Sequence, residues 1–322
     1  VDVLIIIVAR CIYRVVLISP PPGVFVVQYA DDISVYVSGT EISLMSDMIN
    51  NYIQKVLDFL RERELEVSPT KSTVTLFTPD TKEANIHPEV KMDGLKVDLV
   101  KTPKLLGVFF DTMYTFSHHI KETVKKAKGK VNALKSLAGS AWGQDKETLL
   151  ITYKAVVRST LEYGAPIWSP IISPTSWTRL QTVQNQALRT ATGCLTMSSQ
   201  HHLHRECKVI PVREHSTLLT KQHTASCHQD NSPGHRLMDL PPPQRQLKLT
   251  HLQHVPEISD KFRGMTYKYV VKALHTATVA STLALYPPNR VLKRRPPDIS
   301  KEEKLLPRPV RSELARLRSG AS

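Results

Sequence analysis

The chain has 322 residues, enough for one large domain or two of ordinary size with a substantial apolar core. Its 43 Lys and Arg against 29 Asp and Glu give a formal net charge of +14, which favours a polyanionic partner such as nucleic acid over an acidic small substrate. An ordinary basic protein that is kept soluble by its charge is the alternative. Four scattered cysteines without CxxC pairs disfavour a secreted disulfide scaffold and indicate a reducing intracellular compartment, nuclear or cytoplasmic.

The first segment, Val1 to Ile18, is rich in Val and Ile but contains Asp2, Arg10 and Arg14, which are unfavourable at the centre of a bilayer. Its unbroken apolar run, Val3 to Ala9, is too short for a membrane helix. We therefore expect a buried strand, with a membrane anchor as the minor alternative. The absence of a leading Met and of a small-residue cleavage site favours a truncated reading frame over a signal peptide.

The next hundred residues predict mixed α and β structure. Val24 to Val27 and Ile33 to Val37 are β-branched and aromatic runs that predict a hairpin with acidic residues in its turn. Thr40 is a candidate N-cap for an amphipathic helix, because apolar residues then recur in steps of three and four. Two further strands are expected at Thr73 to Phe77 and Leu105 to Phe110. The apolar positions of the helix are Ile42, Met45, Ile49, Ile53, Val56 and Leu60.

From Ser117 the pattern predicts consecutive helices. Asp145 can cap a helix that runs towards Leu161, and Pro174 can begin another that Gly193 ends. The first of these helices has its apolar positions at Ile120, Val124, Ala127, Val131, Leu134 and Leu137.

The periodicity fades beyond about Thr196. A His-rich and Pro-rich stretch there predicts irregular or partly disordered structure, apart from a helix near Tyr267 to Ala280. The tail from Arg290 to Ser322 has ten Lys or Arg against four acids, which suits a phosphate-facing arm or a solvated end.

Asp31 and Asp32 are neighbouring carboxylates in the predicted turn, where like charges repel unless a cation neutralises them. Magnesium is usually held by one or two carboxylates together with substrate phosphates, so this pair could be half of a phosphoryl-transfer site. Asp is also favoured in turns by its own hydrogen bonds to the backbone, and for an isolated Asp-Asp pair that explanation is the commoner one. The surrounding sequence has to decide between them.

Gln28-Tyr29-Ala30-Asp31-Asp32 between apolar strands resembles the catalytic hairpin of reverse transcriptases. The sequence after it continues in the order typical of jockey-like non-LTR retrotransposons, and the resemblance covers roughly residues 21–320. The similar segments are Leu65 to Lys71 leading to Phe77 (the next palm segment), Lys104 to Asp111 (the primer-grip strand), Tyr153 to Ala155, Leu161 to Trp168 and Gln184 to Arg189 with Thr192-Gly193 (thumb and post-thumb), and Leu306 to Arg308 with Leu314 to Gly320.

This resemblance implies a role for each matching residue. Asp31 would be a bridging ligand of two magnesium ions and Asp32 a supporting ligand, while Tyr29 would lie near the primer terminus. Lys71 would stabilise charge on the phosphates or donate a proton to pyrophosphate, although a solvated loop lysine explains it equally well. Val1 to Ser19 does not match the family's glycine-rich segment or its earlier metal-binding Asp, so one set of metal ligands is missing.

The helix from Ser117 carries many lysines, with only Glu122 to offset them, and could track a template and primer backbone. A solvated polar face is the alternative. Tyr153, Tyr163 and Trp168 could stack on bases, but a core position is the commoner role of aromatics at helical spacing. The lysines are Lys121, Lys125, Lys126, Lys128 and Lys130.

A His- and Cys-containing stretch suggests zinc by residue type but not by spacing, and dispersed polar residues are the ordinary explanation. The residues concerned are His201, His202, His204, Cys207 and His215.

We therefore expect an α+β chain: an unmatched apolar segment at 1–19, a partial reverse-transcriptase palm at 20–116, a helical thumb at 117–195 and an irregular basic region at 196–322. The expected activity is RNA-directed DNA synthesis by two-metal nucleotidyl transfer, with magnesium as cofactor and an RNA template, a DNA primer and deoxynucleoside triphosphates as partners. No membrane partner is expected, and the sequence gives no signal for an oligomeric state. Because one metal motif is missing, the chain is expected to be inactive alone. A non-catalytic nucleic-acid-binding remnant of a mobile element is the alternative.

Overall fold

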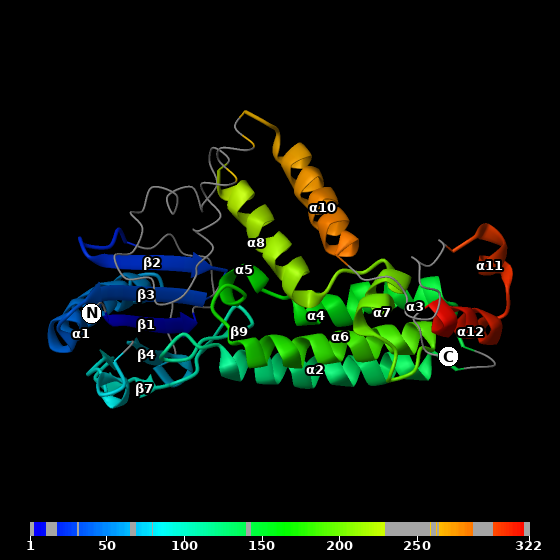
Figure 1. The fold of residues 1–322 in the computed structure, drawn as a ribbon. Coiled ribbons are helices and arrows are strands. Elements are labelled where there is room, and N and C mark those ends of the chain that lie inside the picture. Colours follow the sequence, from blue (N-terminus) through cyan, green and yellow to red (C-terminus); the bar gives the residue numbers. More distant parts are fainter. Residues whose placement is uncertain are drawn as a thin grey trace. The chain divides into compact units, whose positions relative to one another are not determined.

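The computed structural model describes residues 18–30, 32–64, 69–78, 80–139, 143–228, 258, 262, 264–285 and 299–318, and the backbone of 3–10. The chain divides into two compact units, Val1–His119 and Ile120–Ser322 (Figure 1). The first combines strands with a helix and the second consists of helices, which confirms the mixed α and β content.

The first unit is built on a five-stranded sheet with the order β2-β3-β1-β4-β7. Strand β1 pairs antiparallel with both β3 and β4, β2 pairs antiparallel with β3, and β7 adds a short parallel edge to β4. The expected strand near the start of the chain is thus confirmed over residues 3–10, and 11–17 lie outside the described residues. The strands are β1 Val3–Arg10, β2 Val24–Tyr29, β3 Asp32–Gly39, β4 Thr73–Phe77 and β7 Asp98–Leu99.

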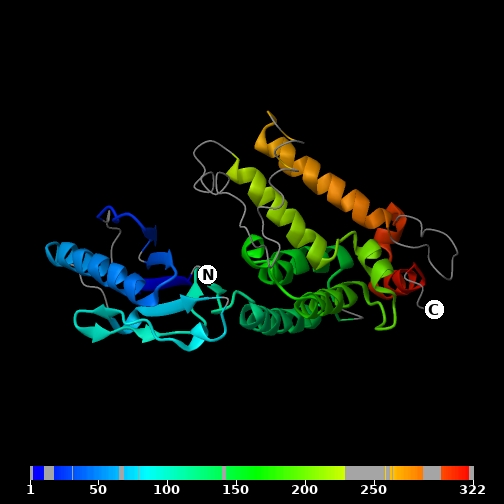
Figure 2. The same ribbon diagram turned by 60° about the vertical axis from the view of Figure 1, so that its left-hand side comes forward.

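Helix α1, Ile42–Arg61, lies against the sheet (Figure 2) and packs on β1, β2 and β3. The predicted positions from Met45 to Leu60 are buried and share one core with Val35 and Val74. The predicted cap was wrong: Glu41 is the N-cap residue, and it makes no side-chain cap hydrogen bond.

The strand predicted at Leu105 to Phe110 was also wrong as a single element. The chain forms a small hairpin, β8 Lys104–Leu105 and β9 Val108–Phe109, which turns through positive φ angles at Leu106 and Gly107. The run of apolar residues hid this turn, because a lone Gly inside such a run fits a strand as well as a bend. The remaining short elements of this unit are η1 Pro69–Lys71, η2 Glu83–Asn85, β5 Lys91–Met92 and β6 Leu95–Lys96.

The second unit confirms the predicted helices and their end signals. Asp145 accepts a hydrogen bond from the Thr148 backbone N–H at 3.1 Å, and Gly193 ends its helix with a φ of 75°. Its elements are α2 Ser117–Ser136, which begins in the first unit, α3 Lys146–Thr152, the π-helix η3 Tyr153–Arg158, α4 Ser159–Leu161, α5 Ala165–Trp168, α6 Pro174–Thr192, α7 Gln200–Cys207, α8 Val212–Cys227, α10 Tyr267–Ala284, α11 Lys301–Leu305 and α12 Arg308–Arg318.

The prediction of irregular structure beyond Thr196 was wrong for the described residues, which include α7, α8, α11 and α12, whereas the helix expected near Tyr267 is confirmed as α10. Helix α8 packs on α5 and α10. Part of its buried face is polar, and the Thr220 and Thr224 hydroxyls donate to carbonyls of their own helix at 3.0 Å. Buried hydroxyl residues break the apolar periodicity on which the prediction rested.

None of the described helices has both the length and the apolar character needed to span a bilayer.

A buried ionic cluster joins the last helices to the rest of the second unit. Glu206 on α7 accepts from Lys146 Nζ at 2.6 Å and from Arg318 Nε at 2.6 Å, and Arg318 Nη1 also donates to Glu303 at 2.7 Å. Burial by itself raises the pKa of Glu206, but the hydrogen bonds and charges of Arg318 and Lys146 outweigh burial and leave that pKa below its usual value. The cluster therefore holds α12 against α3 and α7.

Glu206→Gln should lower the free energy of unfolding by about 3–5 kcal/mol, because it leaves the buried Lys146 without its carboxylate and Arg318 with that of Glu303 alone. Chemical denaturation measures this loss. Glu302→Gln, which removes an exposed carboxylate from α11, is the matched control and should change stability little. Equal stability of the two variants would contradict a structural role for the cluster.

Candidate functional site

The predicted hairpin is confirmed and has a two-residue connection. Tyr29 and Asp32 are the last cross-strand pair, so two residues separate the strands. Ala30 has a φ of 52°, a left-handed conformation that is unfavourable for alanine, and the Gln28 side chain donates to its carbonyl at 3.4 Å. Asp31 lies outside the described residues, whereas Tyr29 is 64% exposed. A two-residue hairpin connection favours positive φ, so the conformation of Ala30 follows from the turn.

The sheet brings Asp32 and Lys71 to the same end. Asp32 pairs with Arg10 of β1, and Val8 of the same strand pairs with Thr73 of β4. Lys71 precedes Thr73 by two residues and ends η1, which contacts β1, so it lies near the end of the sheet at which Asp32 begins β3. Lys71 is exposed at the end of η1.

The described residues do not fit a complete magnesium site. Across these residues, no group of three or more His, Cys, Asp or Glu side chains is arranged to hold a metal ion. The register position opposite Asp32 carries Arg10, so it does not add a carboxylate to that of Asp32. The sequence did not predict this pairing, because Arg10 was interpreted only as a residue that is unfavourable in a membrane span. The unbroken apolar run Val3 to Ala9 predicts a buried strand but not the partner of that strand.

Helix α2 presents its lysines to solvent. Ile120, Ala127 and Val131 are fully buried, whereas all five predicted lysines are exposed. Lys130 Nζ donates to the Thr160 hydroxyl at 2.6 Å, so this lysine has a local structural partner. Lys121, Lys125 and Lys128 lie along one side of α2, and Lys126 and Lys130 lie on another side, so the exposed part of the helix is cationic.

Two of the three candidate stacking residues belong to the core. Tyr153 and Trp168 are fully buried, and the Trp168 indole N–H donates to the Tyr163 carbonyl at 2.8 Å. The Tyr153 hydroxyl accepts from the Gln184 amide at 2.8 Å, and burial raises its pKa above the usual value. Tyr163 is 56% exposed and is the one of the three that can reach a base.

The His-rich stretch is packed into the second unit. His204 is 1% exposed, and its Nδ1 lies 2.8 Å from the Val209 carbonyl, to which it donates. Burial lowers the pKa of His204 to about 4, so its ring is neutral near pH 7. His215 Nδ1 lies 2.8 Å from the Glu162 carboxylate, and burial raises the pKa of Cys207. These partners support the ordinary explanation over zinc.

The chain is similar to curated proteins that are named as polymerases of mobile elements, and no family model matches it. It is 24% identical over 230 residues to the probable RNA-directed DNA polymerase from transposon BS of Drosophila melanogaster, covering 71% of this chain and 25% of that protein. The corresponding protein from transposon X-element of the same species is 27% identical over 185 residues (57% and 20%). The RNA-directed DNA polymerase from mobile element jockey of Drosophila funebris is 22% identical over 170 residues (53% and 18%).

These relatives confirm the resemblance to the reverse transcriptases of jockey-like retrotransposons. The chain spans a quarter or less of the length of these three proteins.

The buried His204 should make the second unit sensitive to acid. Its pKa is lower in the folded state than in the unfolded chain, so the unfolded chain binds more protons between those two values and stability falls as the pH drops from about 6.5 to about 4. The expected loss is roughly 2–3 kcal/mol. His204→Gln should flatten the stability profile over this range, and His275→Gln, at an exposed position of α10, should leave it unchanged. Denaturation at stepped pH tests this, and an unaltered slope in His204→Gln would contradict it.

Proposed function

We propose that the chain is the palm and thumb portion of an RNA-directed DNA polymerase of a non-LTR retrotransposon. Residues 20–116 correspond to part of the palm, 117–195 to the thumb and 196–322 to a basic C-terminal region. The observation that carries the proposal is the β2–β3 hairpin, in which Asp32 follows a two-residue connection and lies at the end of the sheet near Lys71. The names of the similar proteins support the same activity.

Each proposed role follows from where the residue lies. Asp31 and Asp32 would contribute carboxylates to magnesium, which activates a primer hydroxyl and steadies the leaving pyrophosphate when it is bound. Tyr29, exposed beside the turn, would contact the primer end, and Lys71 would offset charge on the nucleotide phosphates. The exposed lysines of α2 would contact the backbones of an RNA template and a DNA primer.

A second candidate, a nucleic-acid-binding remnant without catalysis, is favoured by one observation. Arg10 occupies the register position opposite Asp32. An arginine at this register position adds no carboxylate to a metal site, while polyanion binding by α2 does not depend on it. The two candidates therefore share nucleic-acid binding and differ in synthesis.

Primer extension separates these candidates. The chain is incubated with magnesium, deoxynucleotides and a labelled DNA primer on an RNA template, beside Asp31→Asn and Asp32→Asn variants. We expect the unmodified chain to bind the primer and template without extending the primer, because Val1 to Ser19 does not match the family's earlier metal-binding Asp and Arg10 stands opposite Asp32. Extension that both variants abolish would show that the site is complete, and would overturn the remnant.

Arg10→Asp should tighten magnesium binding by about tenfold, because it replaces the cation opposite Asp32 with a carboxylate. Calorimetric titration with magnesium measures the change. Lys96→Asp, which makes the same charge change at an exposed position of β6, is the matched control and should bind magnesium as the unmodified chain does. Asp31→Asn in the Arg10→Asp background should remove the gain. If Arg10→Asp and its control bind equally, the turn is not a metal site and the assignment to the palm loses its main support.

A further inference from the structure

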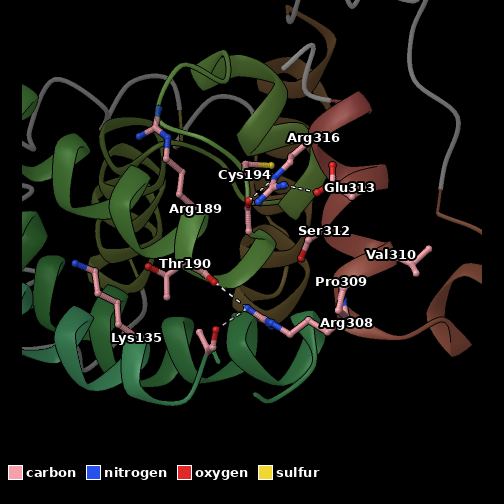
Figure 3. A pocket seen from close by; sticks show the side chains of 12 residues that line it. Lys135, Arg189, Thr190, Cys194, Arg308, Pro309, Val310, Ser312, Glu313 and Arg316 are labelled. Atoms are coloured by element: carbon pink, nitrogen blue, oxygen red, sulfur yellow. Dashed lines mark hydrogen bonds and ion pairs between the residues drawn. The ribbon is translucent and has the colours of Figure 1, made fainter. Parts of the chain in front are cut away.

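A basic pocket lies in the second unit where the C-terminal ends of α2 and α6 meet the start of α12 (Figure 3). Its volume is about 560 Å³. Four cationic side chains line it, Lys135 from α2, Arg189 from α6, and Arg308 and Arg316 from α12, against the single carboxylate of Glu313 among the described lining residues. The lining is therefore strongly positive.

The pocket arginines are oriented largely by neutral carbonyls. Figure 3 shows Arg308 reaching from α12 to the opposite wall, where its Nη2 donates to the Thr190 carbonyl at 3.1 Å. Arg316 Nε donates to the Gly193 carbonyl at 3.0 Å, and its Nη1 pairs with Glu313. Carbonyl partners hold a guanidinium in place without cancelling its charge. The pKa of Arg308 lies below its usual value, because the guanidinium is partly buried and lies near the charge of Arg311.

The pocket lies at the end of a lysine stripe. Lys121, Lys125 and Lys128 are spaced by four and three residues, and Lys135 follows after two further turns, so all four lie along one side of α2. The stripe spans about 21 Å at 1.5 Å per residue. Each strand of a duplex carries one phosphate per roughly 3.4 Å of the duplex axis. The stripe therefore matches the axial length of about six phosphates of one strand. Lys135 belongs to both the stripe and the pocket.

We propose that the stripe and the pocket form one continuous binding track for the phosphodiester backbone of a nucleic acid strand, and that α12 completes the track. The inference rests on the proposed function for the choice of nucleic acid as the polyanion. Helix capping alone explains the carbonyl contacts of Arg308. It does not explain the excess of positive charge or the alignment of Lys135 with the lysines of α2. The track carries no base specificity, because contacts to phosphate are the same for every sequence.

The test is fluorescence anisotropy of the full chain with a labelled DNA–RNA hybrid over a range of salt concentrations. Lys135→Gln should weaken binding by about threefold to tenfold and reduce the salt slope by roughly 0.9. Glu313→Gln should instead tighten binding by about threefold, because it removes the carboxylate of the pocket. Lys304→Gln and Glu302→Gln on α11 make the same charge changes at exposed positions and should bind as the unmodified chain does. A gain of affinity cannot result from misfolding, so Glu313→Gln protects the test against that explanation.

Two results would overturn the inference, and they differ in what they say of the proposed function. If Lys125→Gln weakens binding while both pocket variants match their controls, α2 binds nucleic acid and the pocket is structural only. If the unmodified chain does not bind the hybrid at low salt, the track and the proposed nucleic-acid function fail together.

Discussion

The hydrogen bonding of β1 to both of its neighbours determines the geometry of the first unit. Strands β3 and β4 join the sheet on opposite sides of β1, so the register of that strand decides which residues reach the end of the sheet where the hairpin turns. A shift of one residue would move every side chain of β1 to the opposite face and would remove Arg10 from the level of Asp32. The neighbourhood of Asp32, Arg10 and Lys71 is thus a property of strand pairing and not of the hairpin alone.

An equivalent role in the second unit belongs to the carboxylate of Glu206. Lys146 on α3 and Arg318 on α12 converge on it, and none of the three side chains is more than 11% exposed. Loss of one partner from such a cluster strongly destabilises the folded protein, because a buried charge is left uncompensated. The intact cluster stabilises the fold little more than apolar residues of similar size would. Its main effect is therefore to specify where α12 docks. The basic pocket depends on that docking, because α12 supplies two of its arginines.

Features that depend on neighbouring residues could be predicted from the sequence. The β-branched runs predict the hairpin, and the helical spacing of apolar residues predicts the amphipathic faces of α1 and α2. Pro174 and Gly193 predict the two ends of α6. The small hairpin at Leu106-Gly107 and helix α8 could not, because a turn within an apolar run and buried hydroxyl residues leave no periodic signal.

The residues of the candidate site also differ in whether they could be predicted from neighbouring residues. Asp31, Asp32 and Lys71 were recognised from short motifs, as was the charge of α2. The position of Arg10 opposite Asp32 could not be predicted, because a cross-strand pair depends on register between segments that are distant in sequence. The same holds for the pocket, which joins Lys135 to arginines more than 50 residues away.

Catalysis and nucleic-acid binding place different physical demands on this chain. Two-metal chemistry requires carboxylates held within a fraction of an ångström, and a single cation at the wrong register position is enough to disturb it. Backbone binding depends on the number of released counterions, and it tolerates changes in the placement of individual lysines. The sheet that carries the acids and the helices that carry the lysines also lie in separate compact units. Loss of the proposed metal site would therefore leave the proposed cationic track intact, and the proposed nucleic-acid binding would not depend on synthesis.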